Sequence, residues 1–244
     1  MNNMFDLTGK VAVVTGASSG LGHDAAIAYA EYGADVALLA RRYDRLVELK
    51  EKIEKETGRK ALAIKCDVTN EEEIKAAVNE VLDKFGKIDI LLNNAGTNIL
   101  GDVVNLKRED WDTVLNTNLR SDFLTSKYVV PHMIERKYGK IVNIASVNAV
   151  MADKDEWIQR PAYNASKAGV VGLTMAMSTA LAKHGITVNA IGPGLFPTEM
   201  TEPLFGLEPF MTSYSQRNPA CRPANPGELN GAVIFLSSDA SRYC

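Results

Sequence analysis

The strongest constraint on the fold is the alternation of short, uninterrupted apolar runs with longer segments of mixed charge. Strands that are apolar on both sides are buried on both faces, which is typical of a parallel sheet. We expect strands over 11–14, 36–40, 61–66, 88–92, 140–145 and 186–191. We expect helices over 21–32, 42–57, 70–85, 111–135 and 162–183. Repeated strand–helix units predict an α/β fold, with a doubly wound parallel sheet covered by helices on both faces.

Composition excludes several classes of protein. The 244 residues are 46% hydrophobic and 23% charged, as in ordinary globular domains. The formal net charge of -3 offers no basic surplus for nucleic acid. No apolar run is long enough to span a bilayer, and the first residues lack the basic and apolar blocks of a signal peptide. The cysteines Cys66, Cys221 and Cys244 fit neither a disulfide framework nor a metal site, so we expect a cytoplasmic protein.

We expect a single domain over 1–244, because no linker, repeat or low-complexity stretch interrupts the pattern. The segment 194–226 departs from it, being weakly periodic and rich in Pro, Phe, Met and Thr. A long irregular excursion near a site is often a lid. We therefore expect a small lid near 195–220.

A glycine-rich turn follows the first expected strand and opens the first expected helix. Its sequence is Thr15-Gly-Ala-Ser-Ser-Gly-Leu-Gly22. Gly16 permits a tight turn, Gly20 a close approach of a pyrophosphate, and Gly22 close packing of helix on strand. The amides at the start of the helix favour phosphate groups. The turn predicts a Rossmann-type dinucleotide site that includes Gly16, Ser18, Ser19, Gly20 and Leu21, although a purely structural turn has the same spacing.

The end of the second expected strand indicates which dinucleotide is bound. An NAD site usually has an acid there for the ribose 2′-hydroxyl group. This chain has Ala40, followed by Arg41 and Arg42, which can pair with a 2′-phosphate. We therefore expect NADP(H) rather than NAD(H), although two arginines that open a helix are also compatible with a solvated face. After the third strand, Asp67 and Val68 are placed to meet the adenine, or Asp67 caps the next helix.

Tyr163 and Lys167 lie four residues apart, on one face of an expected helix. An ammonium group beside a phenol stabilises the phenolate, so the phenol exchanges its proton more readily near neutral pH. Ser146 lies a short stretch upstream, where its hydroxyl group can hold the oxygen atom whose charge changes. Alone, this spacing is common in helices. It gains weight from the dinucleotide site predicted in the first hundred residues.

From Leu7 to about Ser241 the chain resembles the short-chain dehydrogenase/reductase family, most closely its gluconate 5-dehydrogenase-like and 3-oxoacyl-carrier-protein reductase-like branch. The resemblance rests on a set of motifs in one order: Thr15-Gly-x-x-x-Gly-x-Gly22, Asn93-Asn94-Ala95-Gly96, Asn118, Ser146, Tyr163-x-x-x-Lys167 and Pro193-Gly194. It implies reversible reduction of a ketone to a secondary alcohol by NADP(H).

The resemblance also implies a role for each matching residue. Tyr163 is expected to be the general acid/base, and Lys167 to assist it and bind the nicotinamide ribose. Ser146 is expected to hold the substrate oxygen, and Asn118 to hold a water in a proton relay. The remaining expected cofactor contacts are Asn94, Ala95 and Gly96 on the adenosine side, and Pro193, Gly194 and Thr198 at the nicotinamide carboxamide.

Two features depart from the family pattern. The loop between Ser146 and Tyr163 is longer than usual; in it Trp157 is placed to wall the substrate pocket and Arg160 to face an anionic group, unless the loop is simply solvated. The sequence given also ends at Cys244, before the last strand that family members normally have, so we expect that strand to be missing from it.

The substrate stays open at this point. A sugar acid or polyol such as a ketogluconate fits Asn98, Asn148 and the arginines, whereas an acyl thioester or a steroid fits the aromatic and Met content of the lid. A non-catalytic dinucleotide sensor on the same fold is the less favoured alternative. The resemblance implies a homo-oligomer, either a tetramer or a dimer, a small-molecule substrate, and neither nucleic-acid nor membrane partners.

Overall fold

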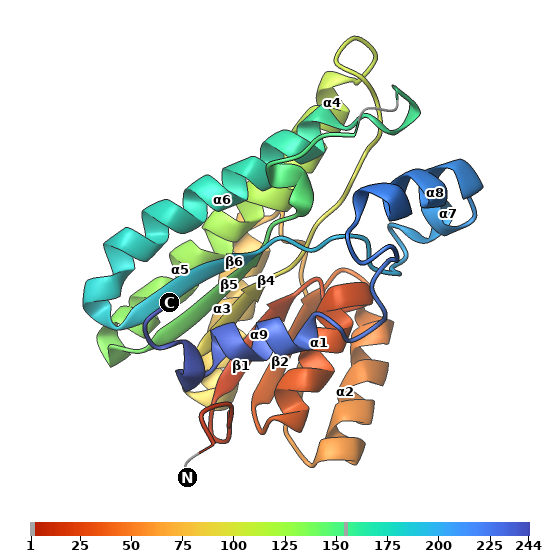
Figure 1. The fold of residues 1–244 in the computed structure, drawn as a ribbon. Helices are drawn as coiled ribbons and strands as arrows, with labels where there is room; N and C mark the ends of the chain where they lie inside the picture. Colours follow the sequence, from red (N-terminus) through yellow and green to blue (C-terminus); the bar gives the residue numbers. More distant parts are fainter. Residues whose placement is uncertain (1–2, 154–155) are drawn as a thin grey trace.

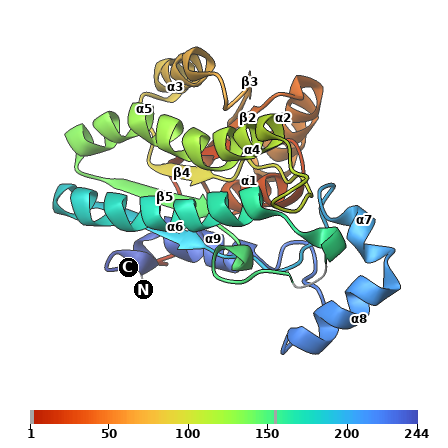
Figure 2. The same cartoon turned by 90° about the horizontal axis from the view of Figure 1, so that it is seen from above.

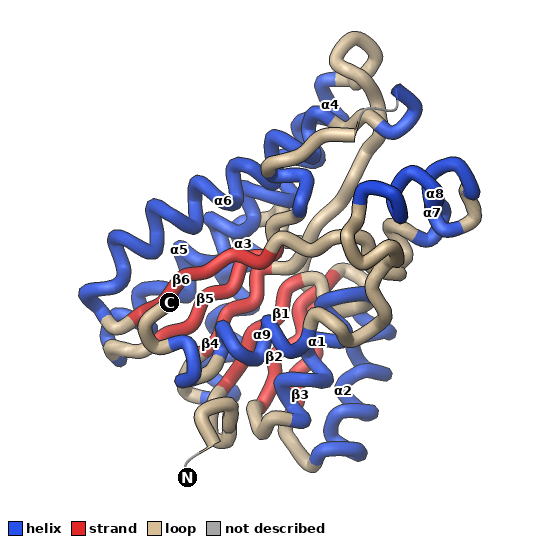
Figure 3. Tube along the Cα trace, in the orientation of Figure 1, coloured by secondary structure: helices blue, strands red, loops and turns tan. Residues whose placement is uncertain are grey.

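The computed structural model describes residues 3–153 and 156–244. Its six strands form one parallel sheet in the order β3-β2-β1-β4-β5-β6 (Figures 1 and 3). The strands are β1 (Val11–Thr15), β2 (Asp35–Ala40), β3 (Ala61–Lys65), β4 (Ile90–Asn93), β5 (Gly139–Ile144) and β6 (Ile186–Ile191). Their ends differ from the predicted ones by at most two residues, so the expected parallel α/β fold is confirmed.

Helices cover both faces of the sheet. The α-helices are α1 (Gly20–Glu31), α2 (Tyr43–Thr57), α3 (Glu71–Phe85), α4 (Arg108–Leu115), α5 (Ser121–Arg136), α6 (Pro161–Leu181), α7 (Glu202–Phe205), α8 (Glu208–Arg217) and α9 (Asn230–Ser237). Short 3-10 turns are Val147–Ala149, Glu156–Ile158, Ala182–His184 and Asp239–Ser241. One buried cluster joins the sheet to α1, α2 and α9, and a second joins its other face to α3, α5 and α6.

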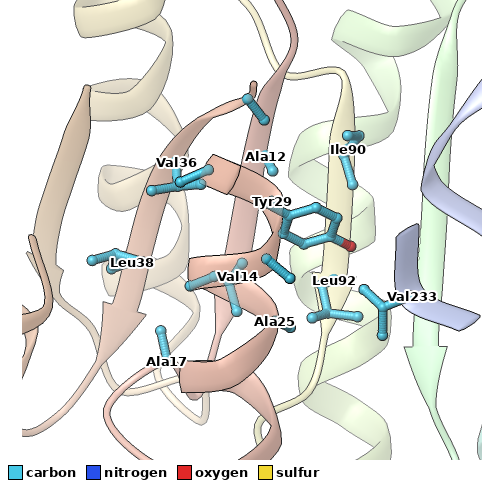
Figure 4. Packing of buried hydrophobic residues seen from close by; sticks show 14 of the residues in the cluster. Ala12, Val14, Ala17, Ala25, Tyr29, Val36, Leu38, Ile90, Leu92 and Val233 are labelled. Carbon is cyan, nitrogen blue, oxygen red and sulfur yellow. The ribbon is translucent and has the colours of Figure 1, made fainter. Parts of the chain in front are cut away.

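Tyr29 is the largest side chain of the first cluster and is fully buried. Figure 4 shows it on α1, among Val14, Leu92 and Val233, which come from two strands and from α9. Its hydroxyl group shares a hydrogen bond of 2.8 Å with the hydroxyl group of Ser237. A buried phenol needs such a partner, and this one fixes α9 against α1.

A chain of buried polar side chains crosses the other face. Asn93 at the end of β4 donates to Asn143 Oδ1 of β5 at 2.9 Å and accepts from Thr125 of α5 at 2.5 Å. Asn143 in turn donates to Thr174 of α6 at 2.9 Å. Each of these four side chains has a partner, which satisfies groups that would otherwise be costly to bury. These hydrogen bonds therefore fix α5 and α6 relative to β4 and β5, which lie beneath both helices.

Two expectations from the sequence need correction. The helix predicted over 111–135 begins earlier, at Arg108, and is interrupted by a π-helical turn at Asn116–Arg120, where Ser121 N donates to the carbonyl group of Asn116 five residues back. The segment predicted to be irregular contains α7 and α8, which lie apart from the other helices in Figure 2. Phe210 and Tyr214, one turn apart on α8, face a small apolar cluster, and this short local period was missed.

Helix α9 was not anticipated either. It is only eight residues long and mostly apolar, with three of its residues buried. Within the described ranges, no helix is long and apolar enough to cross a membrane.

We expect Asn93→Ala to lower the free energy of unfolding by about 1–3 kcal/mol, because it leaves Asn143 and Thr125 buried with fewer partners. Urea unfolding followed by circular dichroism measures this. Asn79→Ala, on the exposed side of α3, is the matched control and should change the free energy little. An Asn93 variant as stable as that control would show that the polar chain does not hold the helices.

Candidate functional site

A cleft of about 460 Å³ lies where the strand order reverses between β1 and β4. Such an edge is where open parallel sheets bind their ligands, because neighbouring loops leave toward opposite faces. All the residues predicted for the cofactor and for catalysis line this cleft, except Asn118. The fold thus brings together side chains that are spread from Gly16 to Thr198.

The glycine turn is held open toward the cleft. Gly16 has a φ of +67°, and a Cβ atom there would lie 2.9 Å from Asn94 Nδ2 and from Ala95 Cα. A Cβ at Gly22 would lie 2.6 Å from the Gly16 carbonyl oxygen, so helix α1 packs on the turn as closely as its glycines allow. Among the described residues no side chain caps the start of α1, which leaves its first amides for an anion.

Asn94 fastens this turn to the end of β4. Its side-chain amide donates to the carbonyl groups of Thr15 at 3.0 Å and of Gly16 at 3.3 Å. The Thr15 hydroxyl group accepts from the backbone amides of Asn94 and Ala95 at 2.9 and 3.1 Å. Asn94 therefore satisfies two backbone carbonyl groups at the end of β1 and in the glycine turn.

Arg41 and Arg42 stand at the outer end of the cleft, and both are exposed. Arg42 lies against the glycine turn: its guanidinium group donates to the Ser19 hydroxyl at 2.7 Å and to the Ser18 hydroxyl at 3.1 Å. It also forms an ion pair with Glu199, which the sequence analysis had given no role.

Asp67 lines the same end of the cleft, but its Oδ1 atom accepts from the amide and hydroxyl groups of Thr69 at 2.9 and 2.8 Å. Burial opposes ionisation, yet these hydrogen bonds and the charge of Arg41 hold the pKa of Asp67 below its usual range. Asp67 therefore shapes the turn before α3. Val68 beside it is buried and lines the cleft.

Ser146, Tyr163 and Lys167 lie at the inner end of the cleft. Ser146 ends the segment after β5, and its hydroxyl group accepts from the Asn148 amide at 3.1 Å. Tyr163 and Lys167 follow one another along α6, and Lys167 Nζ lies 5.9 Å from the centre of the Tyr163 ring. Lys167 is 4% exposed and donates to the Ile144 carbonyl group at 2.7 Å, which fixes the ammonium group at the end of β5.

Asn118 lies in the π-helical turn and is fully buried. Its side chain accepts from Thr97 N at 2.7 Å and donates to Thr97 O at 2.9 Å and to the Ser166 hydroxyl at 3.0 Å. These bonds join the segment after β4 to α6. Extra helical turns of this kind are frequent at functional sites.

Asp122 is a buried acid that the sequence analysis missed. It lies one turn after Asn118, on α5, and is 3% exposed. Burial raises its pKa to about 8, although the Lys167 charge and a hydrogen bond from Ser121 oppose this. Burial also lowers the pKa of Lys167, and the Asp122 charge opposes that shift. Each group therefore supports the ionised form of the other beneath the cleft.

The long loop before Tyr163 packs against α8. Trp157 contacts the ring of Phe210 edge to face, with ring centres 6.2 Å apart, and is half exposed. Ile158 is buried in a cluster with Leu195 and Phe210. Arg160 forms an ion pair with Asp153 at 2.6 Å, and its guanidinium carbon lies 5.6 Å from the centre of the Tyr163 ring. Residues 154–155 of this loop lie outside the described residues.

Comparison with known proteins identifies the family. The model of the short chain dehydrogenase family matches residues 10–207. This chain belongs to the short-chain dehydrogenase/reductase family. It is an oxidoreductase of that family, as the motifs had implied, and three relatives illustrate the range of the match.

A 5-keto-D-gluconate 5-reductase of Escherichia coli (strain K12) is 39% identical over 243 residues, which cover 100% of this chain and 94% of the relative. A 3-oxoacyl-acyl-carrier-protein reductase of Thermotoga maritima is 38% identical, covering 97% of this chain and 94% of the relative. The solved structure of a gluconate 5-dehydrogenase from Burkholderia cenocepacia J2315, in complex with NADP and tartrate, superposes with a TM-score of 0.93 at 34% identity, covering 98% of this chain and 92% of that one.

We expect Asp122→Asn to change how stability depends on pH. The folded wild type keeps a proton on Asp122 up to about pH 8, whereas the unfolded chain releases it near pH 4. Between these values the folded state binds more protons, so the wild type loses stability as the pH rises. The variant lacks this loss, and its stability relative to the wild type should increase from pH 4 to pH 8.

Urea unfolding at a series of pH values measures this difference. Asp44→Asn, at an exposed position on α2, is the control and should follow the wild type at every pH. A constant difference between Asp122→Asn and the wild type across the range would contradict the buried, proton-holding carboxyl group.

Proposed function

We propose that this protein is an NADP(H)-dependent oxidoreductase that reversibly reduces a ketone of a sugar acid to a secondary alcohol. The observation that carries the proposal is a single cleft that has cofactor-binding features at one end and proton-transfer groups at the other. A glycine turn and two arginines stand at its outer end, and Ser146, Tyr163 and Lys167 stand at its inner end.

The residues present fit a dinucleotide. A side chain at Gly16 would collide with Ala95, so the turn stays narrow, and the first amides of α1 face the cleft. Arg41 and Arg42 would hold a 2′-phosphate, in line with Ala40 standing where an NAD site has an acid. Asp67, Val68 and Asn94 to Gly96 would line the adenosine side, and Pro193, Gly194 and Thr198 the nicotinamide side. The solved relative with NADP supports this choice.

The bound cofactor supplies or accepts the hydride, and the chain's own residues handle the proton. The Ser146 hydroxyl group holds the substrate oxygen in place. Tyr163 gives its phenolic proton to that oxygen in the reduction and takes a proton from the alcohol in the reverse direction. The buried Lys167 ammonium, fixed by Ile144, stabilises the phenolate that is left. Asn118 keeps the segment after β4 and helix α6 in register, which supports its predicted place in the proton relay.

Arg160 near Tyr163 and an unpaired polar group on Asn98 favour a sugar acid. The Asn98 side-chain oxygen is buried and has no partner among the described residues, so it can still accept a hydrogen bond. Asp153 is shared by Arg160 at 2.6 Å and Arg217 at 4.0 Å, so among the described side chains two guanidinium groups meet one carboxylate. This leaves positive charge for a substrate carboxylate. The keto-gluconate reductase among the relatives agrees.

A 3-oxoacyl thioester is the second candidate, supported by the Thermotoga maritima relative and by the apolar residues of the lid. In the structure, however, the buried lid residues Leu195 and Phe210 pack on each other and on Ile158. They are therefore less available to line an acyl chain.

We expect Tyr163→Phe to lower kcat by about 100-fold or more, because it removes the proton donor and keeps the ring. NADPH binding should stay close to wild type, since the phenol oxygen is not needed to hold the phosphates. NADPH absorbance and fluorescence titration measure the two quantities. Tyr32→Phe, at an exposed position after α1, is the control. Full activity of Tyr163→Phe would refute the assignment.

We expect 5-keto-D-gluconate to have a higher kcat/KM than a neutral ketohexose or a 3-oxoacyl thioester. Its carboxylate and hydroxyl groups suit the arginines and Asn98, whereas the other two substrates lack one or both. Initial rates of NADPH oxidation with the three substrates decide this. A preference for the thioester would favour the second candidate and leave the oxidoreductase assignment in place.

A further inference from the structure

Glu199 connects the start of the lid to the outer end of the cleft. One oxygen of its carboxylate accepts from Arg42 Nη1 at 2.7 Å, and the other accepts from Arg45. Glu199 lies just before α7, and the two arginines lie at the start of α2, more than 150 residues earlier in the chain. The contact therefore brings an anion from the lid to the arginine that the glycine turn holds in place.

The other two nitrogen atoms of the Arg42 guanidinium group also donate hydrogen bonds. Its Nη2 atom donates to Ser19 and Ser18, and its Nε atom to Ser18 at 3.3 Å. The serine hydroxyl groups thus orient the guanidinium group beside the phosphate-binding turn, and Nη1 points to the carboxylate. Ser18, Ser19, Arg42 and Glu199 all line the cleft.

A carboxylate and a phosphate make the same demand on an arginine, because each presents two anionic oxygen atoms that can accept paired N–H groups. Hydrogen bonds from Arg45 and Arg42 hold the pKa of Glu199 well below its usual range, so Glu199 is ionised at neutral pH. A 2′-phosphate that uses Arg42 must then take Nη1 from Glu199 or share it with a second negative charge.

We propose that Glu199 competes with the 2′-phosphate of the cofactor for Arg42 and so determines how strongly this protein prefers NADPH to NADH. The proposal rests on the NADP(H) use proposed above for the same cleft. Here Ala40 removes the acid usual at the end of β2, and the lid supplies an acid from another part of the chain.

The exposure of these groups separates this role from a structural one. The side chains of Glu199, Arg42 and Arg45 are 48%, 44% and 47% exposed. Exposed ion pairs contribute little to folding stability, so removing the carboxylate should leave the fold intact. An exposed ion pair worth up to about 1 kcal/mol can nevertheless be measured in binding. Its loss changes the dissociation constant of a competing ligand by up to about fivefold.

The test uses two fragments that differ only in the phosphate at issue, adenosine 2′,5′-bisphosphate and 5′-AMP. Isothermal titration calorimetry gives their Kd values for the wild type, Glu199→Gln, Glu202→Gln, and Glu199→Gln combined with Arg42→Ala. Glu202 is exposed, lies three residues further on, and forms no ion pair among the described residues. Its substitution removes the same charge without freeing Arg42.

We expect Glu199→Gln to bind the bisphosphate about three- to fivefold more tightly than the wild type does, and 5′-AMP equally well. Glu202→Gln should bind both fragments as the wild type does. In the Arg42→Ala background the gain should disappear. Unfolding midpoints of all variants confirm that each is folded.

Other outcomes overturn the inference, and they can be told apart from a failure of the proposed function. If the wild type binds the bisphosphate no better than 5′-AMP, the NADP(H) assignment itself fails. If the bisphosphate is preferred but Glu199→Gln changes nothing, only the competition fails. If Glu199→Gln weakens 5′-AMP, the carboxylate holds the ribose and does not compete with the phosphate.

Discussion

The site depends on the hydrogen bonds with which Asn94 closes the point where the strand order reverses. From β1 the chain turns into α1 on one face of the sheet, and from β4 it continues toward α5 on the other, so the two loops diverge. Asn94 and the Thr15 hydroxyl group bind each loop to the other through four bonds. If the loops after β1 and β4 only diverged, the width of the cleft between them would not be fixed. With these bonds, the glycine turn keeps a fixed position relative to the end of β4, and so relative to the residues proposed for catalysis.

The inner end of the cleft is fixed by buried polar contacts. Such contacts are strong in the weakly polar protein interior when every group has a hydrogen-bond partner. Lys167 reaches from α6 to the end of β5, where the Ile144 carbonyl group accepts its hydrogen bond, and the buried Asp122 carboxyl group lies on α5. The Asn93–Asn143 pair holds the strands beneath both helices. Because these contacts lie on helices and strands, the distance from Lys167 to the Tyr163 ring is set by rigid elements.

The sequence predicted what depends on neighbours in the chain. Buried strands appear as apolar runs, and the glycine turn is a local conformational requirement, so the parallel fold and the edge that holds the cleft were found. Contacts between segments that are far apart in the chain produce no local pattern in the sequence, so they were not predicted. The burial of Asn118 depends on Thr97 and Ser166, and the setting of Asp122 depends on Lys167. Glu199 looked like an ordinary residue after Thr198, because its partners lie on α2. Helix α8 had a weak local signal, the spacing of Phe210 and Tyr214.

The lid meets both ends of the cleft, and this explains why its apolar residues are poor guides to the substrate. Leu195 and Phe210 are buried against Ile158 of the loop before Tyr163, so they hold that loop in position. At the outer end of the cleft, Glu199 meets the arginines beside the glycine turn. An apolar composition that suggests an acyl or steroid pocket is therefore largely used for internal packing. The Arg160–Asp153 pair, by contrast, is a polar contact that lies near Tyr163. Under the proposed function, selection among ketones would then depend on charge and hydrogen bonding as well as on apolar surface.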